Sequence, residues 1–184
     1  KKWNIMHPAV YDLKNKLIEL RHLNSMDYLL EWDQQVNVPP KGNEARAEVI
    51  AYISGLSHKN FTSSEFEDVL MRAKLAMDSG VLNDDEICIV SKTLDDFIKS
   101  KKLPSDFVKE LSLTCALAHD YWVRARKTSD FGLFAAHLKK IVELKREEAR
   151  LVGYNTTSPY DVLLDDYEPG LTSVKAEEIL TEVK

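Results

Sequence analysis

Apolar side chains recur every three or four residues along most of this chain, which is the spacing of one face of an α-helix. Pro8, a residue favoured in a first helical turn, precedes the first such stripe. Thr62 with Glu65, and Asn83 with Glu86, have the spacing of a capping box, in which two side chains satisfy free N–H groups at a helix start. Four helices are thus predicted, on the stripes Val10, Leu13, Leu17 and Leu20; Ala45, Val49, Ile53 and Leu56; Phe66, Val69, Leu70, Ala73 and Met77; and Ile87, Val90, Leu94 and Phe97.

The second half of the chain continues the helical pattern. A fifth helix is predicted over about 104–125. A sixth is predicted from Asp130, a good N-cap residue, to Gly153, a typical residue just beyond a helix end. A turn-rich stretch follows and contains a short helix at about 160–165. Strand-like alternation of useful length is not seen, so the predicted fold class is all-α.

The last apolar stripe runs over 174–183 and is still continuing at Lys184. A helix of roughly three turns at a chain end needs a partner for its apolar face. We therefore expect the C-terminus to be a cut end, and an exposed apolar patch near this helix and the segment 160–172.

Composition excludes several function classes. The 184 residues are 44% hydrophobic and 30% charged, which is typical of a globular chain rather than a disordered one. No apolar run approaches the ~20 residues of a membrane span. The formal charge is −5, whereas nucleic-acid binding usually needs a basic surface, because clustered Lys and Arg neutralise the phosphates. Neither a membrane nor a nucleic acid is therefore expected as a partner.

Cysteine use points to a reducing compartment. Only Cys88 and Cys115 occur, each inside a helix-like stretch. Such isolated cysteines are typical of small core residues rather than of a disulfide framework. The expected location is cytoplasmic.

Metal-binding motifs give no complete site. Each of the five histidines is followed by a residue other than Glu, so the His-Glu-x-x-His zinc-peptidase signature is absent from these 184 residues. Glu19 and His22 supply one Glu-x-x-His pair, whereas a di-metal centre in a helical bundle needs two. A small helical di-metal protein remains one hypothesis, which metal analysis would test.

Three segments together resemble one known family. They are EWDQQVNVPP at 31–40, followed by Gly42 and Arg46; Trp122, Arg126, Asp130, Phe131, Phe134 and Leu138; and YDVLLDDYEPGLT at 160–172. Their order and spacing are similar to the N-terminal part of the thermostable (Taq-type) carboxypeptidase family of metallocarboxypeptidases. The resemblance runs from about Tyr11 to the end of the chain, and Val38 replaces the Met that is usual before the proline.

The resemblance implies a helical enzyme of more than twice this length, folded as two lobes around a deep groove. Residues 1–152 would form the N-terminal helical lobe, and 153–184 the connecting segment and the start of the catalytic region. Zinc or another divalent metal would be held downstream, so no catalytic or metal-binding residue is expected here. The parent enzyme would release C-terminal amino acids from peptides, and a homodimer is possible; this stretch should be inactive alone.

Seven matched residues are candidates for lining the groove or the contact between lobes. Trp32 is expected to anchor the loop after the first helix, with its ring buried. Asp33 is expected to cap a helix or pair with Arg46. The candidates are Trp32, Asp33, Arg46, Tyr160, Asp161, Asp165 and Tyr167.

A free-standing, non-catalytic helical module that acts through protein–protein contacts is the alternative. A native stop codon after Lys184 would favour it, and a reading frame that continues into a His-Glu-x-x-His helix would exclude it.

Overall fold

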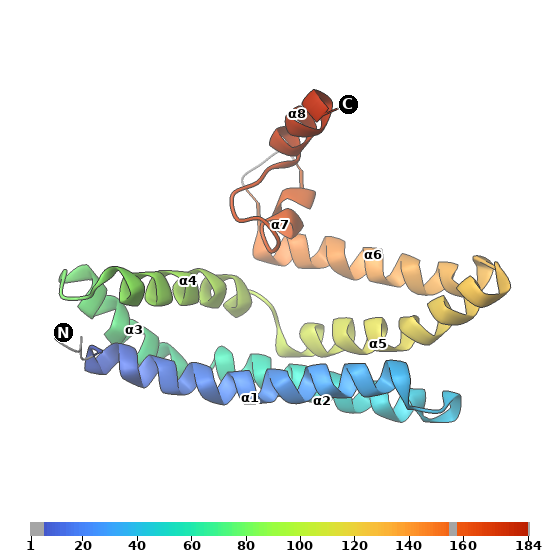
Figure 1. Cartoon of the computed structure of the whole chain (residues 1–184), viewed down its shortest axis with the longest axis horizontal. Coiled ribbons are helices and arrows are strands. Elements are labelled where there is room, and N and C mark those ends of the chain that lie inside the picture. Colours follow the sequence, from blue (N-terminus) through green and yellow to red (C-terminus); the bar gives the residue numbers. More distant parts are fainter. Residues whose placement is uncertain (1–5, 155–157, 184) are drawn as a thin grey trace. The chain divides into compact units, whose positions relative to one another are not determined.

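The computed structural model describes residues 6–154 and 158–183, and all the regular structure in these ranges is helical (Figure 1). The all-α prediction is confirmed. None of the described helices is long and apolar enough to cross a membrane. The elements are α1 (Pro8–Val36), the short 3-10 helix η1 (Pro40–Gly42), α2 (Asn43–Phe61), α3 (Ser64–Asp78), α4 (Asp84–Lys101), α5 (Ser105–Thr128), α6 (Gly132–Val152), α7 (Tyr160–Leu164) and α8 (Ser173–Val183).

The chain divides into two compact units, Lys1–Asp120 and Tyr121–Lys184, with the division inside α5. The domain boundary expected after residue 152 stays a prediction. Each unit is described by itself.

The first unit holds the main hydrophobic core. α1 packs against α2 and α3, and α3 packs against α4. Phe61, Phe66 and Phe97 form an aromatic cluster in which the ring centroids of Phe61 and Phe66 are 4.8 Å apart. Burying a large apolar side chain stabilises the fold by roughly 1.5–3 kcal/mol. The buried cluster comprises Val10, Leu13, Leu20, Phe66, Val69, Leu70, Ala73, Ala76, Leu82, Val90 and Phe97.

Helix starts agree with the sequence in one case and differ in another. The capping box at α4 is present, because the Asn83 side chain accepts from the Glu86 N–H and Glu86 accepts from the Asn83 N–H. At α3 the predicted box on Thr62 is wrong. Ser63, one residue later, has the extended backbone of an N-cap, and its Oγ accepts from the Phe66 N–H at 3.2 Å.

The sixth helix also begins slightly later than expected. Asp130 precedes it by two residues, and its Oδ1 accepts from the Gly132 N–H at 2.9 Å. Its carboxylate therefore still satisfies a free N–H group at the helix start.

Small polar side chains join the first part of α5 to α1 and α2. The Ser54 and Ser112 hydroxyls lie 3.0 Å apart, and the Gln34 amide donates to the Ala116 carbonyl at 3.4 Å. The Asn43 amide donates to Asp120 at 3.2 Å. We call this contact the polar seam. The buried apolar residues of α2 and α5, such as Ile50 and Ala118, lie outside the core cluster between α1, α3 and α4.

In the second unit, α6 packs against α7, and α7 packs against α8. The rings of Tyr121 and His137 stack with centroids 3.9 Å apart, and the Arg124 guanidinium lies 4.4 Å from the centroid of the Tyr121 ring. Leu144 and Ala149 are buried on α6.

The last helix leaves its apolar side chains exposed, as expected from the sequence. No residue of α8 is buried. The exposed apolar and aromatic side chains in and before it are Tyr160, Tyr167, Val174, Ile179, Leu180 and Val183.

Cys88 and Cys115 are both exposed, so the expectation that they are core residues is wrong. Each lies on a helix whose buried face is set by other positions, such as Val90 and Phe97 on α4.

Candidate functional site

The predicted contact between Asp33 and Arg46 is present and joins α1 to α2. The Arg46 guanidinium donates to Asp33 Oδ2 and, at 3.5 Å, to the Leu30 carbonyl. The Asn37 amide donates to Asp33 Oδ1 at 3.0 Å. The hydrogen bonds that Asp33 accepts from Asn37 and Arg46 lower the pKa of its carboxyl group, and the one from Asn37 has the larger effect. Asp33 is therefore an ionised structural partner at neutral pH.

Trp32 does not lie in the loop after α1, and its ring is not buried. α1 continues to Val36 because the first strong helix breakers after it are Pro39 and Pro40, so Trp32 is within the helix. The residue is 56% exposed. The expectation of a buried anchor is wrong for this structure.

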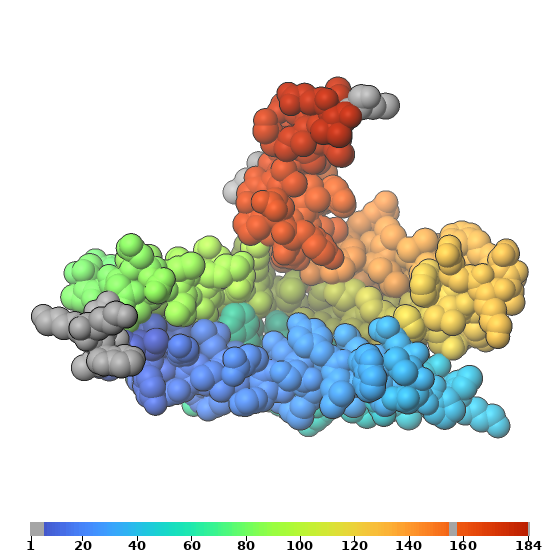
Figure 2. Space-filling model, in the orientation of Figure 1, coloured from blue at the N-terminus to red at the C-terminus, as the bar shows by residue number. Residues whose placement is uncertain are grey.

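The C-terminal third of α1 carries an exposed apolar stripe instead. Leu29, Trp32 and Val36 have the spacing of one helix face, and Tyr28 lies beside them. One side of α1 is open to solvent along its length (Figure 2). We call Tyr28, Leu29, Trp32 and Val36 the α1 apolar stripe.

Two of the four candidates in the segment 160–172 hold that segment together. Asp161 is only 6% exposed, and its Oδ1 accepts from the Ser173 N–H at 2.7 Å, so it caps the start of α8. Asp165 Oδ1 accepts from the Gly170 N–H at 2.7 Å. Gly170 has a φ of +83°, a conformation that a side chain would strain.

The two tyrosines of this segment are exposed to solvent. Tyr160 is exposed, and Tyr167 is 88% exposed. The seven candidates thus form two groups. Asp33 and Arg46 contact each other in the first unit, with Trp32 beside them in sequence. Tyr160, Asp161, Asp165 and Tyr167 belong to the second unit.

A carboxylate pair beside the polar seam was not predicted from the sequence. Asp27 and Glu31 are one helical turn apart on α1, and Ser54 donates to Asp27 Oδ2 at 2.8 Å. Asp27 Oδ1 is enclosed and accepts no hydrogen bond from the described residues. Burial raises the pKa of Asp27, and burial together with the Asp27 charge raises the pKa of Glu31. The sequence signal that could have predicted this pair is the position of Asp27 on the apolar face of the first helix.

The described residues supply no metal site. Among them, no three His, Cys, Asp or Glu side chains lie together in a way that would hold a metal ion. Glu19, part of the Glu-x-x-His pair, instead accepts from the Lys16 ammonium at 3.2 Å. No catalytic step is assigned to the described residues.

Comparisons with known proteins agree on one group. A family model described as carboxypeptidase Taq (M32) metallopeptidase matches residues 12–184. Carboxypeptidase 1 of Bacillus subtilis (strain 168) is 29% identical over 179 residues, which are 97% of this chain and 35% of that protein. Thermostable carboxypeptidase 1 of Pyrococcus furiosus is 36% identical over 152 residues, which are 82% of this chain and 30% of that protein.

The fold is similar as well. The crystal structure of BsuCP matches with a TM-score of 0.89 at 28% identity, covering 96% of this chain and 35% of that one. The chain therefore spans about a third of the length of the proteins that it matches.

Proposed function

Because this chain belongs to the carboxypeptidase Taq (M32) family of metallopeptidases, we propose that it forms the N-terminal helical region of a metal-dependent carboxypeptidase. The enzyme would release single amino acids from the C-termini of peptides. The observation that carries the proposal is the family match over residues 12–184, together with the fold shared with the BsuCP structure. Peptides are the proposed substrates, and the proposed location is the cytoplasm.

The metal is proposed to be zinc, held by residues other than those described here. A bound zinc ion supplies activated water and polarises the scissile carbonyl. Since the described residues lack a cluster of metal ligands, we propose that the 184-residue stretch has no peptidase activity alone.

The proposed role of this stretch is to build a wall of the substrate groove or a contact between lobes. The α1 apolar stripe is suited to packing or to contact with peptide side chains, because it is exposed and not charged. The Asp33–Arg46 pair would keep the end of α1 in place against α2. Tyr160 and Tyr167 present exposed rings on a segment that Asp161 and Asp165 hold in shape.

The second candidate function is a free-standing helical module that binds another protein. The observation that favours it is the set of exposed apolar side chains on α8 and on the α1 apolar stripe, since exposed apolar patches mark interaction sites. A homodimer through such a surface is part of this proposal.

One experiment separates the two functions. The endogenous protein is purified, its intact mass is measured, and its release of amino acids from an N-blocked peptide is followed with and without a chelator. The carboxypeptidase proposal expects a mass well above that of these 184 residues and chelator-sensitive release, with no release by the 184-residue chain supplied with zinc. A native mass equal to that of this chain, with no hydrolysis, would overturn it in favour of the binding module.

A further inference from the structure

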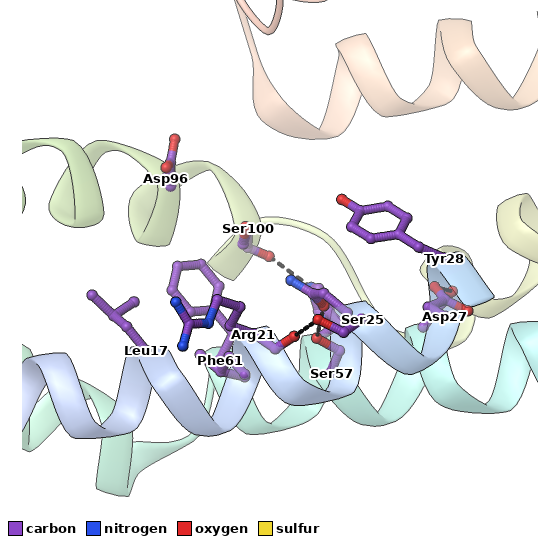
Figure 3. Close-up of a pocket in the computed structure, with 13 residues that line it drawn as sticks. Leu17, Arg21, Ser25, Asp27, Tyr28, Ser57, Phe61, Asp96 and Ser100 are labelled. Carbon is purple, nitrogen blue, oxygen red and sulfur yellow. Dashed lines mark hydrogen bonds between the residues drawn. The ribbon is translucent and has the colours of Figure 1, made fainter. Parts of the chain in front are cut away.

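A pocket of about 580 Å³ lies among α1, α2 and the C-terminal end of α4 (Figure 3). The α1 side of the pocket is built from positions spaced by four, three and four residues, which share one face of a helix. α4 adds Asp96 and Ser100. The side chains of that α1 face are Leu17, Arg21, Asn24 and Tyr28, and those from α2 are Ser54, Ser57, His58 and Phe61.

Hydrogen bonds between the helices fix the wall of this pocket. His58 Nε2 lies 3.0 Å from the Ser100 carbonyl, and its Nδ1 lies 3.1 Å from Ser105 Oγ. Ser57 Oγ donates to Asn24 Oδ1 at 2.7 Å. His58 and Ser57 are therefore already engaged, and the pocket is held by three helices rather than by a loop.

The groups left available to a ligand are hydrogen-bond donors. Arg21 has no ion pair or side-chain hydrogen bond with any described residue, and neither does the Tyr28 hydroxyl. Asn24 uses its oxygen for Ser57, which leaves its NH₂ group to donate. A guanidinium, an amide NH₂ and a phenol together favour an acceptor, and the guanidinium fork matches a carboxylate.

The two carboxylates of the pocket do not cancel this preference. Asp96 pairs with Lys92 at 2.8 Å, so its carboxylate already has a cationic partner. Asp27 accepts from Ser54 with one oxygen, and its other oxygen is enclosed. A cationic ligand would therefore meet Arg21 without reaching a free carboxylate oxygen of Asp27.

The apolar residues of the lining favour a ligand that carries an apolar group. Leu17, Leu20 and Phe61 contribute hydrocarbon and an aromatic ring beside Arg21. We propose that this pocket binds a small carboxylate that carries an apolar group, with the carboxylate on Arg21 and the apolar group against Phe61.

A hydrophobic amino acid released from a peptide belongs to this chemical class. That link rests on the proposed function, and it would make the pocket a product site on the helical region. Carboxylate binding itself does not depend on the link, so the two ideas are tested separately.

The probe is N-acetyl-L-phenylalanine, titrated into the full chain by calorimetry. N-acetyl-L-phenylalaninamide, which keeps the ring and the acetyl group but lacks the carboxylate, is the matched control ligand. Saturable binding of the first and not of the second is expected. Inorganic phosphate is the third arm, and equal binding of phosphate without binding of N-acetyl-L-phenylalanine would overturn the ligand class.

Variants locate the site. Arg21→Gln should raise the Kd for N-acetyl-L-phenylalanine by about ten- to a hundredfold, as the loss of a charge-assisted hydrogen bond does. Arg72→Gln, an exposed arginine on α3, is the control and should leave the Kd unchanged. Tyr28→Phe removes only the hydroxyl and should weaken binding less, and a thermal melt shows whether each variant is folded.

Undiminished binding by both Arg21→Gln and Tyr28→Phe would place the ligand elsewhere and overturn the proposal. Because calorimetry requires no hydrolysis, a native protein that binds the probe but releases no amino acids from peptides would disprove the proposed function alone. An active carboxypeptidase whose chain does not bind the probe would disprove the pocket alone.

Discussion

Two carboxylates of the first unit have pKa values that are shifted in opposite directions, for physical reasons that the structure makes plain. The His7 and Asn83 backbone N–H groups donate to Glu86, the former at 2.6 Å, and lower its pKa. Asp27 receives one hydrogen bond from Ser54, which does not offset the cost of burying its charge, and its pKa is raised. The stability of the chain should therefore depend on these two residues with opposite pH profiles.

For Glu86, the folded pKa lies below the unfolded one, so its contribution is present above pH about 4.5 and is lost as the pH falls through the folded pKa. We expect Glu86→Gln to lower the free energy of unfolding at pH 7 and to flatten its decline between about pH 5 and pH 3. Urea titrations at several pH values measure this. Glu48→Gln, an exposed change on α2, is the control, and an equally steep acid decline in Glu86→Gln would contradict the assignment.

For Asp27 the sign reverses. Its folded pKa is raised, so its contribution is favourable at low pH and is lost as the pH rises through the folded pKa. Asp27→Asn, which can still accept from Ser54, should be at least as stable as the wild type at pH 7, and its advantage should shrink at pH 4. Asp68→Asn on α3 makes the same charge change at an exposed site. Clear destabilisation of Asp27→Asn alone at pH 7 would refute the expectation.

Local sequence signals predict residue roles well only where one short motif decides them. The Asn83–Glu86 box and the Asp33–Arg46 pair were predicted and are present. The prediction that Thr62 caps α3 was wrong because Ser63, an equally good N-cap residue, follows it directly and takes that position. The prediction that Trp32 lies buried in the loop after the first helix was wrong for two reasons. The end of α1 depends on the position of the first proline after it, and the exposure of Trp32 depends on how the neighbouring helices pack.

Among the helices, α5 approaches α2 at Gly55, where the Lys109 side chain of α5 occupies the space that a side chain at position 55 would need. A Cβ built at Gly55 would lie 2.5 Å from Lys109 Cγ, which is close to its backbone and has little freedom to move away. Alanine gains roughly 0.5–1 kcal/mol of helix propensity over glycine, whereas an overpacked contact costs roughly 1–3 kcal/mol. We expect Gly55→Ala to destabilise the chain by about 1 kcal/mol, measured by urea unfolding.

A second pair of variants separates these two effects. With Lys109→Ala the clashing atoms are absent, so Gly55→Ala introduced into that background should stabilise the chain. The same destabilisation in both backgrounds would show that Lys109 is not the obstacle.

Helix periodicity predicted the elements but not how they pack. The apolar stripes on α1, α3 and α4 became the core because each has one continuous apolar face. The polar seam and the pocket that Arg21 lines were not predicted. Both combine residues from several helices, α1, α2, α4 and α5, and a local sequence pattern does not determine how such helices are placed relative to one another.

Across the whole molecule, buried apolar side chains are distributed unevenly. The core cluster lies entirely in the first unit, whereas the buried hydrophobic residues described beyond Asp120 are Ala125, Leu144 and Ala149. Regions with few buried contacts open locally more often. We expect hydrogen–deuterium exchange to be slowest in α3 and in the core-facing part of α1, and fastest in α8. Equal protection of α3 and α8 would contradict this.

The contact between His7 and Glu86 has a consequence for how the chain is made. The two residues are 79 positions apart, yet the Glu86 carboxylate accepts the His7 N–H just ahead of α1. At a synthesis rate of about 5–20 residues per second, Glu86 is added about 4–16 seconds after His7. On the ribosome, therefore, α2 and α3 are available to pack against α1 before its N-terminal His7 N–H receives a partner, because the Glu86 carboxylate is added only with α4.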